Sequence, residues 1–352
     1  MNSKESRRAE SNCGRACDSP AHARPPRAPG REQMNALLIW FFCAATAVGQ
    51  TQAPPASHEV KQLRVTILST MLADRGIGEW GFAALVEADG RQLLVDTGAR
   101  PETVLSNMRD LKIDLSKVEN VVLTHFHDDH TGGLMTLRAE MKKRNPAALS
   151  QVHEATGFFY SRPSSDGREG NSMIAIRPQY EATGGRFVEH DRAAEILPGV
   201  WVTGPIPRKF PERNWSGSGK VRTPGGVVED TIPDDQSVIV ATSDGLVLIT
   251  GCGHAGVVNI LTATDEQFGH RPIRSVIGGI HMFAAKDEQV DWTADKLKNF
   301  GVRYFIGAHC TGIESVHRMR NRMGLSRQTA VVGAVGATFD LDKGIHAGAI
   351  AQ

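Results

Sequence analysis

The sequence predicts an α/β protein whose sheets and helices form a layered sandwich. The first apolar segments are short and separated by tight turns, which is typical of hairpins, whereas the later ones alternate with segments of helical periodicity. A cluster of histidines and aspartates stands where a buried strand gives way to a helix, so these side chains can converge beyond the edge of a sheet. Hairpins followed by strand–helix alternation favour one layered domain after an N-terminal leader.

The leader has two parts. Residues 1–33 are rich in Arg, Ser, Pro and Ala without apolar periodicity, which is typical of disorder. Within 34–55 an apolar run precedes small residues, which favours a signal peptide and a periplasmic or secreted protein. The run is shorter than the roughly 20 residues of a membrane helix, so we expect no stable span after cleavage. The alternative is a cytoplasmic protein in which the run is a buried or interfacial helix, or a chain that starts at Met34.

Composition weighs against nucleic-acid binding. The chain of 352 residues carries 40 Lys and Arg against 39 Asp and Glu, a net charge of +1. This balance offers no basic excess for tracking phosphates, so we expect a small-molecule substrate and no nucleic-acid partner. Of the five cysteines, Cys252 and Cys310 follow the leader, and both lie in motifs that favour a metal site over a disulfide framework.

The first strands are expected where short runs of apolar and β-branched residues occur. Residues 82–87 and 93–95 are expected to pair across Asp89-Gly90, because Asp-Gly favours the tight turn of a hairpin. Apolar residues recur at helical spacing in 134–144, directly after the histidine-rich segment. The expected elements of this half are strand 64–68, strands 82–87 and 93–95, helix 101–109, strand 121–123 and helix 134–144.

The stretch 156–230 is rich in Gly, Pro, Arg and Ser, and we expect it to be irregular and to roof the site. Its side chains that could grip an anionic or cyclic substrate, or simply be solvated, are Arg208, Lys209, Arg213 and Trp215. After it, strand–helix alternation begins with a hairpin across Asp244-Gly245. The expected elements are strands 237–242 and 246–250, helix 255–263, strand 273–277, helix 289–300, strand 303–306 and helix 312–323.

The segment from Thr124 to Gly133 carries the strongest functional signal. Three imidazoles and two carboxylates fall within six residues, and neutral imidazole and carboxylate are the ligands that zinc and similar divalent ions prefer. The spacing lets His125 and His127 face one ion, while Asp129 and His130 can face a second. The spacing does not indicate to which side the Asp128 side chain points. A solvated polar loop would rarely show this spacing.

This segment resembles the His-x-His-x-Asp-His and Thr-Gly-Gly signature of the metallo-β-lactamase superfamily. The motifs Leu94–Gly98, Thr250–Gly256, Gly278–His281 and His309–Gly312 resemble the branch of 7,8-dihydropterin-6-methyl-4-(β-D-ribofuranosyl)aminobenzene-5'-phosphate synthase-like proteins. The resemblance implies an αββα four-layer sandwich over residues 63–345, with the metals at one edge of the packed sheets.

The resemblance also implies further site residues. His254 and His309, each at a strand end, become the remaining metal ligands beside His125, His127, Asp129 and His130. Cys252 stands where most of the superfamily has Asp, and a thiolate there could ligate zinc. His281 could be a ligand or a substrate-facing donor, and Asp96 could orient a ligating imidazole or tighten its own turn. For His153, a surface or supporting position is favoured.

The implied function is that of a metal-dependent hydrolase with one or two divalent ions, zinc first among them. A bound ion lowers the pKa of water from 15.7 to about 7, giving hydroxide for attack on an ester, lactone, amide or phosphoester. The catalytic residues would be Asp129, which also orients that hydroxide, and His130. The alternatives are a pterin-type synthase, a mononuclear iron dioxygenase and a non-catalytic metal-bound sensor. The sequence indicates neither further substrate-binding residues nor an oligomeric state.

Overall fold

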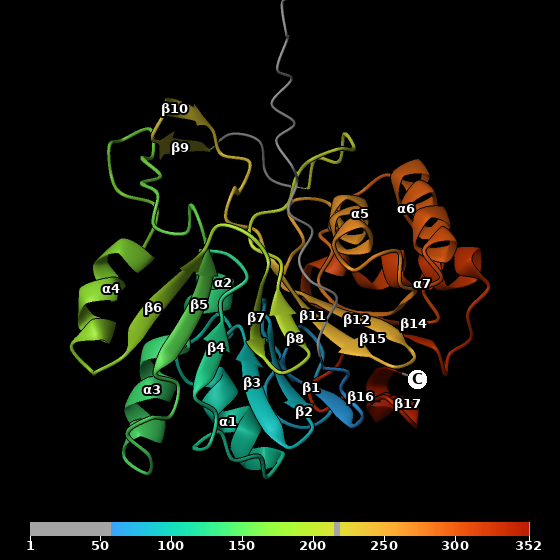
Figure 1. Cartoon of the computed structure of the whole chain (residues 1–352), viewed down its shortest axis with the longest axis horizontal. Coiled ribbons are helices and arrows are strands. Elements are labelled where there is room, and N and C mark those ends of the chain that lie inside the picture. The colour runs from blue at the N-terminus through green and yellow to red at the C-terminus, as the bar shows by residue number, and fades with distance from the viewer. Residues whose placement is uncertain (1–57, 215–218, 352) are drawn as a thin grey trace, which may run out of the picture. The chain divides into compact units, whose positions relative to one another are not determined.

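The computed structural model describes residues 58–214 and 219–351, so the expected leader 1–33 and signal peptide 34–55 lie outside the described residues. Two sheets pack face to face (Figure 1). The order of the eight-stranded sheet is β17 (Gly344–His346), β16 (Thr338–Asp340), β1 (Leu63–Ser69), β2 (Ala83–Ala88), β3 (Arg91–Val95), β4 (Asn120–Val122), β5 (Gln151–Ala155) and β6 (Arg186–His190). Antiparallel pairing holds β17 to β3 together, and parallel pairing joins β3 to β6.

The second sheet has seven strands and is parallel over half its width. Its order is β15 (Ala330–Val332), β14 (Tyr304–Gly307), β13 (Ile273–Gly278), β12 (Gly245–Thr250), β11 (Ser237–Thr242), β8 (Val200–Val202) and β7 (Ala194–Leu197). The strands β12 to β15 run parallel to one another, so their carboxyl ends meet at one edge of the sheet. A separate hairpin pairs β9 (Lys220–Thr223) with β10 (Gly226–Glu229).

Three apolar clusters fill the spaces between four layers. Between the sheets, buried aliphatic side chains of β1 to β4 meet those of β11 to β14, including Ile67, Val95, Val240 and Ile249. The outer face of the first sheet is covered by α1 (Thr103–Asp110), α3 (Leu134–Lys142) and α4 (Met173–Glu181). The outer face of the second sheet is covered by α5 (Val257–Gln267), α6 (Asp287–Asn299) and α7 (Ile313–Met323).

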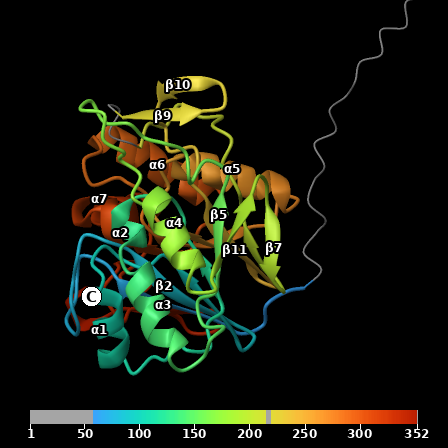
Figure 2. The same ribbon diagram turned by 90° about the vertical axis from the view of Figure 1, so that its left-hand side faces the viewer.

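The side view shows α5 and α6 on the opposite side of the sheets from α1 and α3 (Figure 2). This confirms the predicted αββα four-layer sandwich. The turn across Asp89-Gly90 is also as predicted, since both residues have positive φ, as the two central residues of a type I′ hairpin turn require. Within the described residues, no helix combines the length and the apolar character that crossing a membrane requires.

The prediction of irregular structure for 156–230 is wrong. This stretch contains α4, β6, β7, β8 and the β9–β10 hairpin. The elements are short, and most residues of β6, β7 and β10 are half-buried or exposed. A strand without a buried face lacks the apolar alternation by which strands are recognised in a sequence. The short strands β5, β15, β16 and β17 and the four-residue helix α2 (Asp128–Thr131) were not predicted either.

Candidate metal centre

The histidine loop, defined as residues 124–131, lies where β4 ends and α2 begins. His127 has an extended backbone and occupies the N-cap position of α2, so the chain turns sharply between His125 and Asp129. The two glycines that follow are required by close packing. A Cβ on Gly132 would lie 1.9 Å from the carbonyl oxygen of Ala99, and one on Gly133 would lie 2.2 Å from that of Thr97. The Thr-Gly-Gly part of the motif thus lets the histidine loop pack closely against the turn after β3.

The second sheet supplies donors from the carboxyl ends of three neighbouring parallel strands. Cys252 and His254 follow β12, His281 follows β13, and His309 and Cys310 lie in a short 3₁₀ turn after β14. Thr250 pairs with Gly278, and Gly278 pairs with Gly307, so the three strands end level with one another. The sheet register therefore brings together residues that are far apart in the sequence.

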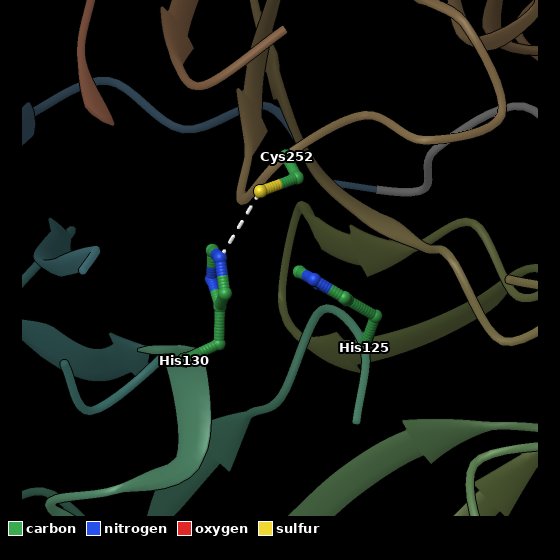
Figure 3. Close-up of side chains that lie close together, drawn as sticks. All are labelled: His125, His130 and Cys252. Carbon is green, nitrogen blue, oxygen red and sulfur yellow. Dashed lines mark hydrogen bonds between the residues drawn. The ribbon is translucent and has the colours of Figure 1, made fainter. Parts of the chain in front are cut away.

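These two regions meet, and their donor atoms converge. The structure contains four groups in which the candidate ligand atoms all lie within 4.8 Å of one another. Figure 3 shows one of them, in which the thiol of Cys252 points to the imidazole of His130, with a His130 Nε2 to Cys252 Sγ distance of 3.2 Å. The four groups are His125, His127 and His254; Asp129, His130 and His309; His125, His130 and Cys252; and Cys252, His281 and Cys310.

A buried hydrogen-bond chain fixes the orientation of two imidazoles of the histidine loop. Asp96 accepts hydrogen bonds from the backbone N–H and from the hydroxyl of Thr124, each at 2.8 Å. Its Oδ2 also lies 2.7 Å from Nδ1 of His130. Since the Thr124 hydroxyl donates to Asp96, its oxygen can accept from Nδ1 of His125, 3.1 Å away. Both rings then direct Nε2 toward the other candidate ligands of the centre.

Several ring nitrogens at the centre lack a partner that would account for their burial. His254 donates from Nδ1 to the carbonyl oxygen of Asn214, and its Nε2 has no hydrogen-bond partner among the described residues. Neither ring nitrogen of His309 has one there, although Nε2 lies 3.2 Å from Asp129 Oδ2. His125 Nε2 faces His127 Nδ1 at 3.0 Å. Buried lone pairs that face one another are costly unless a cation lies between them, so these residues fit a divalent metal.

Burial sets the protonation of the imidazoles that the two sheets share. It lowers the pKa of His125 and His254 far below the usual histidine range, and the charges of neighbouring imidazoles add to this effect. Burial also lowers the pKa of His127 to about 4. These three side chains are therefore neutral near pH 7, which is the form that donates a lone pair to a metal.

Around Asp129, neighbouring charges outweigh burial in setting the pKa values of the side chains. Burial opposes protonation of His130, but the carboxylates of Asp96 and Asp129 outweigh it and raise the pKa of His130 to about 9. Burial likewise acts to raise the pKa of Asp129, yet His130 and His309 hold that carboxyl well below its usual range. Asp129 is thus ionised across the physiological pH range, as a metal-binding or hydrogen-bond-accepting carboxylate must be.

The tripeptide Asp234-Asp235-Gln236, at the start of β11, ties the two regions together. Asp234 accepts a hydrogen bond of 2.9 Å from the backbone N–H of Phe126 in the histidine loop. Asp235 accepts one of 2.9 Å from the backbone N–H of Ala255, next to His254. Gln236 donates its backbone N–H to the carbonyl of Thr124 at 2.9 Å. Sequence reasoning missed these residues; their only signal is a run of polar residues at the start of an apolar strand.

A buried arginine supports the same side of the histidine loop. Arg162 forms ion pairs with Asp230 and Asp234, and its guanidinium carbon lies 3.5 Å from the ring centroid of Phe126. These contacts explain how one charged side chain tolerates almost complete burial, since both its charge and its planar face have partners. Arg162 lies in the stretch that was predicted to be irregular.

Other predicted residues belong to none of the four donor groups. Asp128 points to α4, where its carboxylate accepts a 2.5 Å hydrogen bond from Ser172. His153 bonds to His190 and Asn120 and belongs to none of the four groups. The candidates for gripping substrate mostly have intramolecular partners. Arg208 donates to the carbonyl of His254, Lys209 pairs with Glu266, Arg213 pairs with Glu229, and Trp215 lies outside the described residues.

An exposed aromatic pair borders the centre and was not foreseen. Trp80, in the loop before β2, and Phe283, after β13, pack edge to face with ring centroids 5.2 Å apart. The Trp80 ring lies 5.0 Å from that of His309, and Phe283 lies 5.3 Å from His281. The two side chains nevertheless remain 46% and 51% exposed. Apolar surface of this kind beside buried ligands is suited to hold part of a substrate.

Comparisons with known proteins show to which sequences and folds this chain is similar. A family model described as Metallo-beta-lactamase superfamily matches residues 81–267. A 7,8-dihydropterin-6-methyl-4-(β-D-ribofuranosyl)-aminobenzene-5'-phosphate synthase of Methanocaldococcus jannaschii is 30% identical over 241 residues, 66% of this chain and 81% of that protein. An atrochrysone carboxyl ACP thioesterase of Aspergillus terreus is 28% identical over 169 residues, 42% of this chain and 52% of that protein. A crystal structure of a metal-dependent hydrolase of the β-lactamase superfamily is 26% identical, with a TM-score of 0.64 over 79% of this chain and 98% of that one.

Proposed function

Since the chain belongs to the metallo-β-lactamase superfamily, we propose that it is a metal-dependent hydrolase of a small-molecule ester, lactone, amide or phosphoester. One observation carries the proposal. Two donor groups lie side by side, one of three imidazoles and one of Asp129, His130 and His309. In each group one buried imidazole, that of His254 or of His309, has an Nε2 atom without a hydrogen-bond partner among the described residues. The solved metal-dependent hydrolase that this chain resembles, and the thioesterase among its relatives, support the choice of reaction.

The residues that would hold the metal follow from the donor groups. His125, His127 and His254 form the first set, and Asp129, His130 and His309 form the second. Imidazole and carboxylate ligands without a sulfur in either set suit zinc or a similar divalent ion. When bound, such an ion supplies a Lewis acid that polarises the substrate oxygen and makes a water molecule acidic enough to react near neutral pH.

The side chains of this chain provide the rest of the chemistry. Asp129 is ionised and its carboxylate is partly exposed, so either oxygen can accept a hydrogen bond from the attacking water and orient it. Asp96 holds His130 in place through Nδ1 and so keeps Nε2 directed into the centre. Trp80 and Phe283 can pack against the apolar part of a substrate and exclude water beside the reacting bond.

A second candidate function is a pterin-type synthase. Its support is the relative from Methanocaldococcus jannaschii, of which this chain covers 81% at 30% identity. Such an enzyme would use the same donor groups for condensation instead of hydrolysis. The exposed aromatic pair suits either reaction, because it can stack against a planar ring or pack against an acyl chain.

The test begins with elemental analysis of the purified full chain. A screen of lactone, β-lactam, thioester and phosphodiester substrates follows, before and after chelation and re-addition of metal. We expect one or two zinc ions per chain and hydrolysis that is lost on chelation and restored by zinc. A single iron ion without hydrolysis would favour the dioxygenase. Metal-dependent condensation of a pterin with an aromatic amine, in the absence of hydrolysis, would favour the synthase instead.

We propose export separately, on the apolar segment within residues 34–55. Fractionation of cells that express the full chain, with sequencing of the mature N-terminus, tests it. Cleavage between residues 47 and 53 is the expected result. An uncleaved chain in the cytoplasmic fraction would contradict export and leave the proposed chemistry intact.

A further inference from the structure

We propose that Cys252, Cys310 and His281 form a sulfur-rich metal subsite at the same centre, one that takes a borderline or soft divalent ion such as zinc or cadmium. This inference rests on the proposed function, because it concerns one wall of the same site. The three ligand atoms lie within 4.8 Å of one another, and both thiols are buried. Cys310 is the new member, since the sequence places it in a motif that favours a metal site but does not include it among the expected ligands.

The Sγ atoms of Cys252 and Cys310 lie in direct contact with each other. Their Sγ–Sγ distance is 3.2 Å, and both cysteines are free thiols. A disulfide would need about 2.05 Å, whereas two thiolates on one tetrahedral zinc ion, at about 2.3 Å each, stand about 3.8 Å apart. The observed separation lies between these values and nearer to that of shared ligation. A modest rotation of either side chain therefore suffices to admit an ion.

His281 completes the group from the neighbouring strand end. Its backbone φ is +51°, in the left-handed region, which a non-glycine residue adopts only where the surroundings hold it. Those surroundings are visible: the carbonyl of Cys310 accepts hydrogen bonds from the backbone N–H groups of Met282 and Phe283, at 2.9 and 3.1 Å. The loop that carries the imidazole is thus fastened directly to the turn that carries the thiol.

The nitrogen of His281 also points to a ligand. Its Nδ1 is fully buried and has no hydrogen-bond partner among the described residues. Burying an imidazole nitrogen without a partner is unfavourable, and ligation of a cation removes that cost. Together, the free nitrogen and the two thiols offer three donors, which leaves a fourth position for water or substrate on a tetrahedral ion.

Glycine makes the approach of Cys310 possible. A Cβ on Gly279 would lie 2.8 Å from Cys310 Sγ and 2.1 Å from the carbonyl oxygen of Gly251. Any side chain at this position would push the thiol away from Cys252. The strand ends after β12, β13 and β14 are therefore packed in a way that keeps the two sulfur atoms in contact.

The chemistry of this subsite differs from that of its neighbours. Thiolate ligands select zinc and softer ions over magnesium, calcium or manganese, whereas the imidazole and carboxylate groups discriminate less. Cys252 also lies in the group with His125 and His130, so its sulfur faces both parts of the centre. The subsite would thus favour zinc at the side of the centre that the second sheet builds.

The experiment uses the full chain, stripped with a chelator and reloaded with Co²⁺. Thiolate ligation gives an intense thiolate-to-cobalt charge-transfer band in the near ultraviolet, which imidazole and carboxylate ligands do not give. We expect this band in the wild-type protein. Cys252→Ser and Cys310→Ser should each reduce it to about half or less, and the double variant should abolish it. A matched control replaces the three leader cysteines, Cys13, Cys17 and Cys43, with Ser and should keep the whole band.

The outcomes separate this proposal from its rivals. A band that Cys252→Ser removes but Cys310→Ser leaves unchanged would assign Cys252 to the group of His125 and His130 and overturn the subsite. A band that survives in the double variant would overturn it as well. Because the wild-type band is read without substrate, a protein that shows it but hydrolyses nothing would contradict the proposed hydrolase and not the subsite.

A measurement on the unaltered protein guards against misfolded variants. X-ray absorption at the zinc edge of the reloaded wild-type chain should show sulfur neighbours at about 2.3 Å. Only nitrogen and oxygen neighbours at about 2.0–2.1 Å would contradict thiolate ligation outright. His281→Ala should keep the cobalt band but shift its position, since one nitrogen ligand is lost while both sulfurs remain.

Discussion

The histidine loop and the strand ends of the second sheet supply donors to the same centre in opposite ways. The loop places four donors within six consecutive residues, and their geometry follows from the tight turn into α2. The second sheet brings its donors from three strand ends, and their geometry follows from the parallel register of β12, β13 and β14. The loop is therefore a local structure, whereas the other half of the centre exists only when the whole sheet has formed.

The donor groups nevertheless cross this boundary. His125 and His127 from the loop group with His254 from the second sheet, and Asp129 and His130 group with His309. Asp234 and Asp235, through their carboxylates, and Gln236, through its backbone N–H, bind backbone groups of the two regions. Removal of a ligand from either the histidine loop or the second sheet should therefore impair metal binding by the donor group that the two regions share.

The largest effect is expected from the removal of one ligand on each side. His127→Ala and His254→Ala should each lower kcat/KM by more than about 100-fold, because each leaves its donor group with two imidazoles. Both variants should also lose about one metal ion per chain, read by elemental analysis, while far-UV circular dichroism stays unchanged. Asp129→Ala should abolish metal-dependent turnover in the same way.

The control for this pair is His317→Ala, because His317 is exposed on α7 and belongs to no donor group. It should keep wild-type metal content and rate. Full metal content and turnover in the His254 variant would show that the second sheet does not share the loop's ion.

A smaller effect is expected from Asp96→Asn, which alters support for the loop while keeping all ligands. Asp96 accepts from Thr124 twice and contacts His130 Nδ1, and an amide cannot accept from all three. We expect metal affinity to fall about 10- to 100-fold, as is usual when the partner of a ligating histidine is lost. Competition with a chromophoric chelator measures this change, and an affinity within about twofold of wild type would argue against an orienting role.

The same contrast explains how much the sequence alone could predict. The histidine loop is recognisable from residue type and spacing, and the hairpin across Asp89-Gly90 from its turn chemistry. His254 and His309 stand alone in the sequence, so only the family resemblance singled them out. Asp234 stands in a short polar run that does not reveal its role, and Arg162 and Trp80 gave no local signal, because the roles of all three depend on partners that the tertiary fold brings near.

The prediction of strands from the sequence was limited in the same way, because some strands depend on their neighbours in the sheet. Buried strands such as β11 and β12 are continuous apolar runs and were predicted closely. In contrast, β6 and β7 lie toward the edges of their sheets with half-exposed side chains, so their pattern resembles that of a loop. Their stability comes from pairing with a neighbouring strand, which a single segment of sequence does not reveal.

The boundary between the two regions can be tested at Gly251, directly after β12. A Cβ there would lie 2.0 Å from the Thr124 hydroxyl oxygen and 2.6 Å from Asp96 Oδ2, so the strand end presses against the support of the histidine loop. Gly251→Ala should lower the free energy of unfolding by about 1–3 kcal/mol, as overpacking of a tight site does. Urea denaturation measures it.

The matched control is Gly225→Ala, in the turn between β9 and β10, where a Cβ would meet only the Thr223 hydroxyl at 3.7 Å. Its effect should stay within about 0.5 kcal/mol. Equal free energies of unfolding for Gly251→Ala and Gly225→Ala would mean that the structure can make room for a side chain at Gly251 without being destabilised.

The smallest effect is expected from the aromatic pair, in which each region contributes one ring. Trp80 belongs to the loop before β2 and Phe283 follows β13, and each contacts a different imidazole of the centre. If both rings pack against the substrate, Trp80→Ala and Phe283→Ala should each raise KM about 2- to 10-fold, the equivalent of 0.5–1.5 kcal/mol for one aromatic contact. Steady-state kinetics with the substrate found in the screen should show kcat within about twofold of wild type, because neither ring carries a metal-binding or proton-transferring group. A fall in kcat at constant KM would instead mean that the rings act by holding His309 and His281 in position, and the aromatic pair would then belong to the metal centre and not to the substrate site.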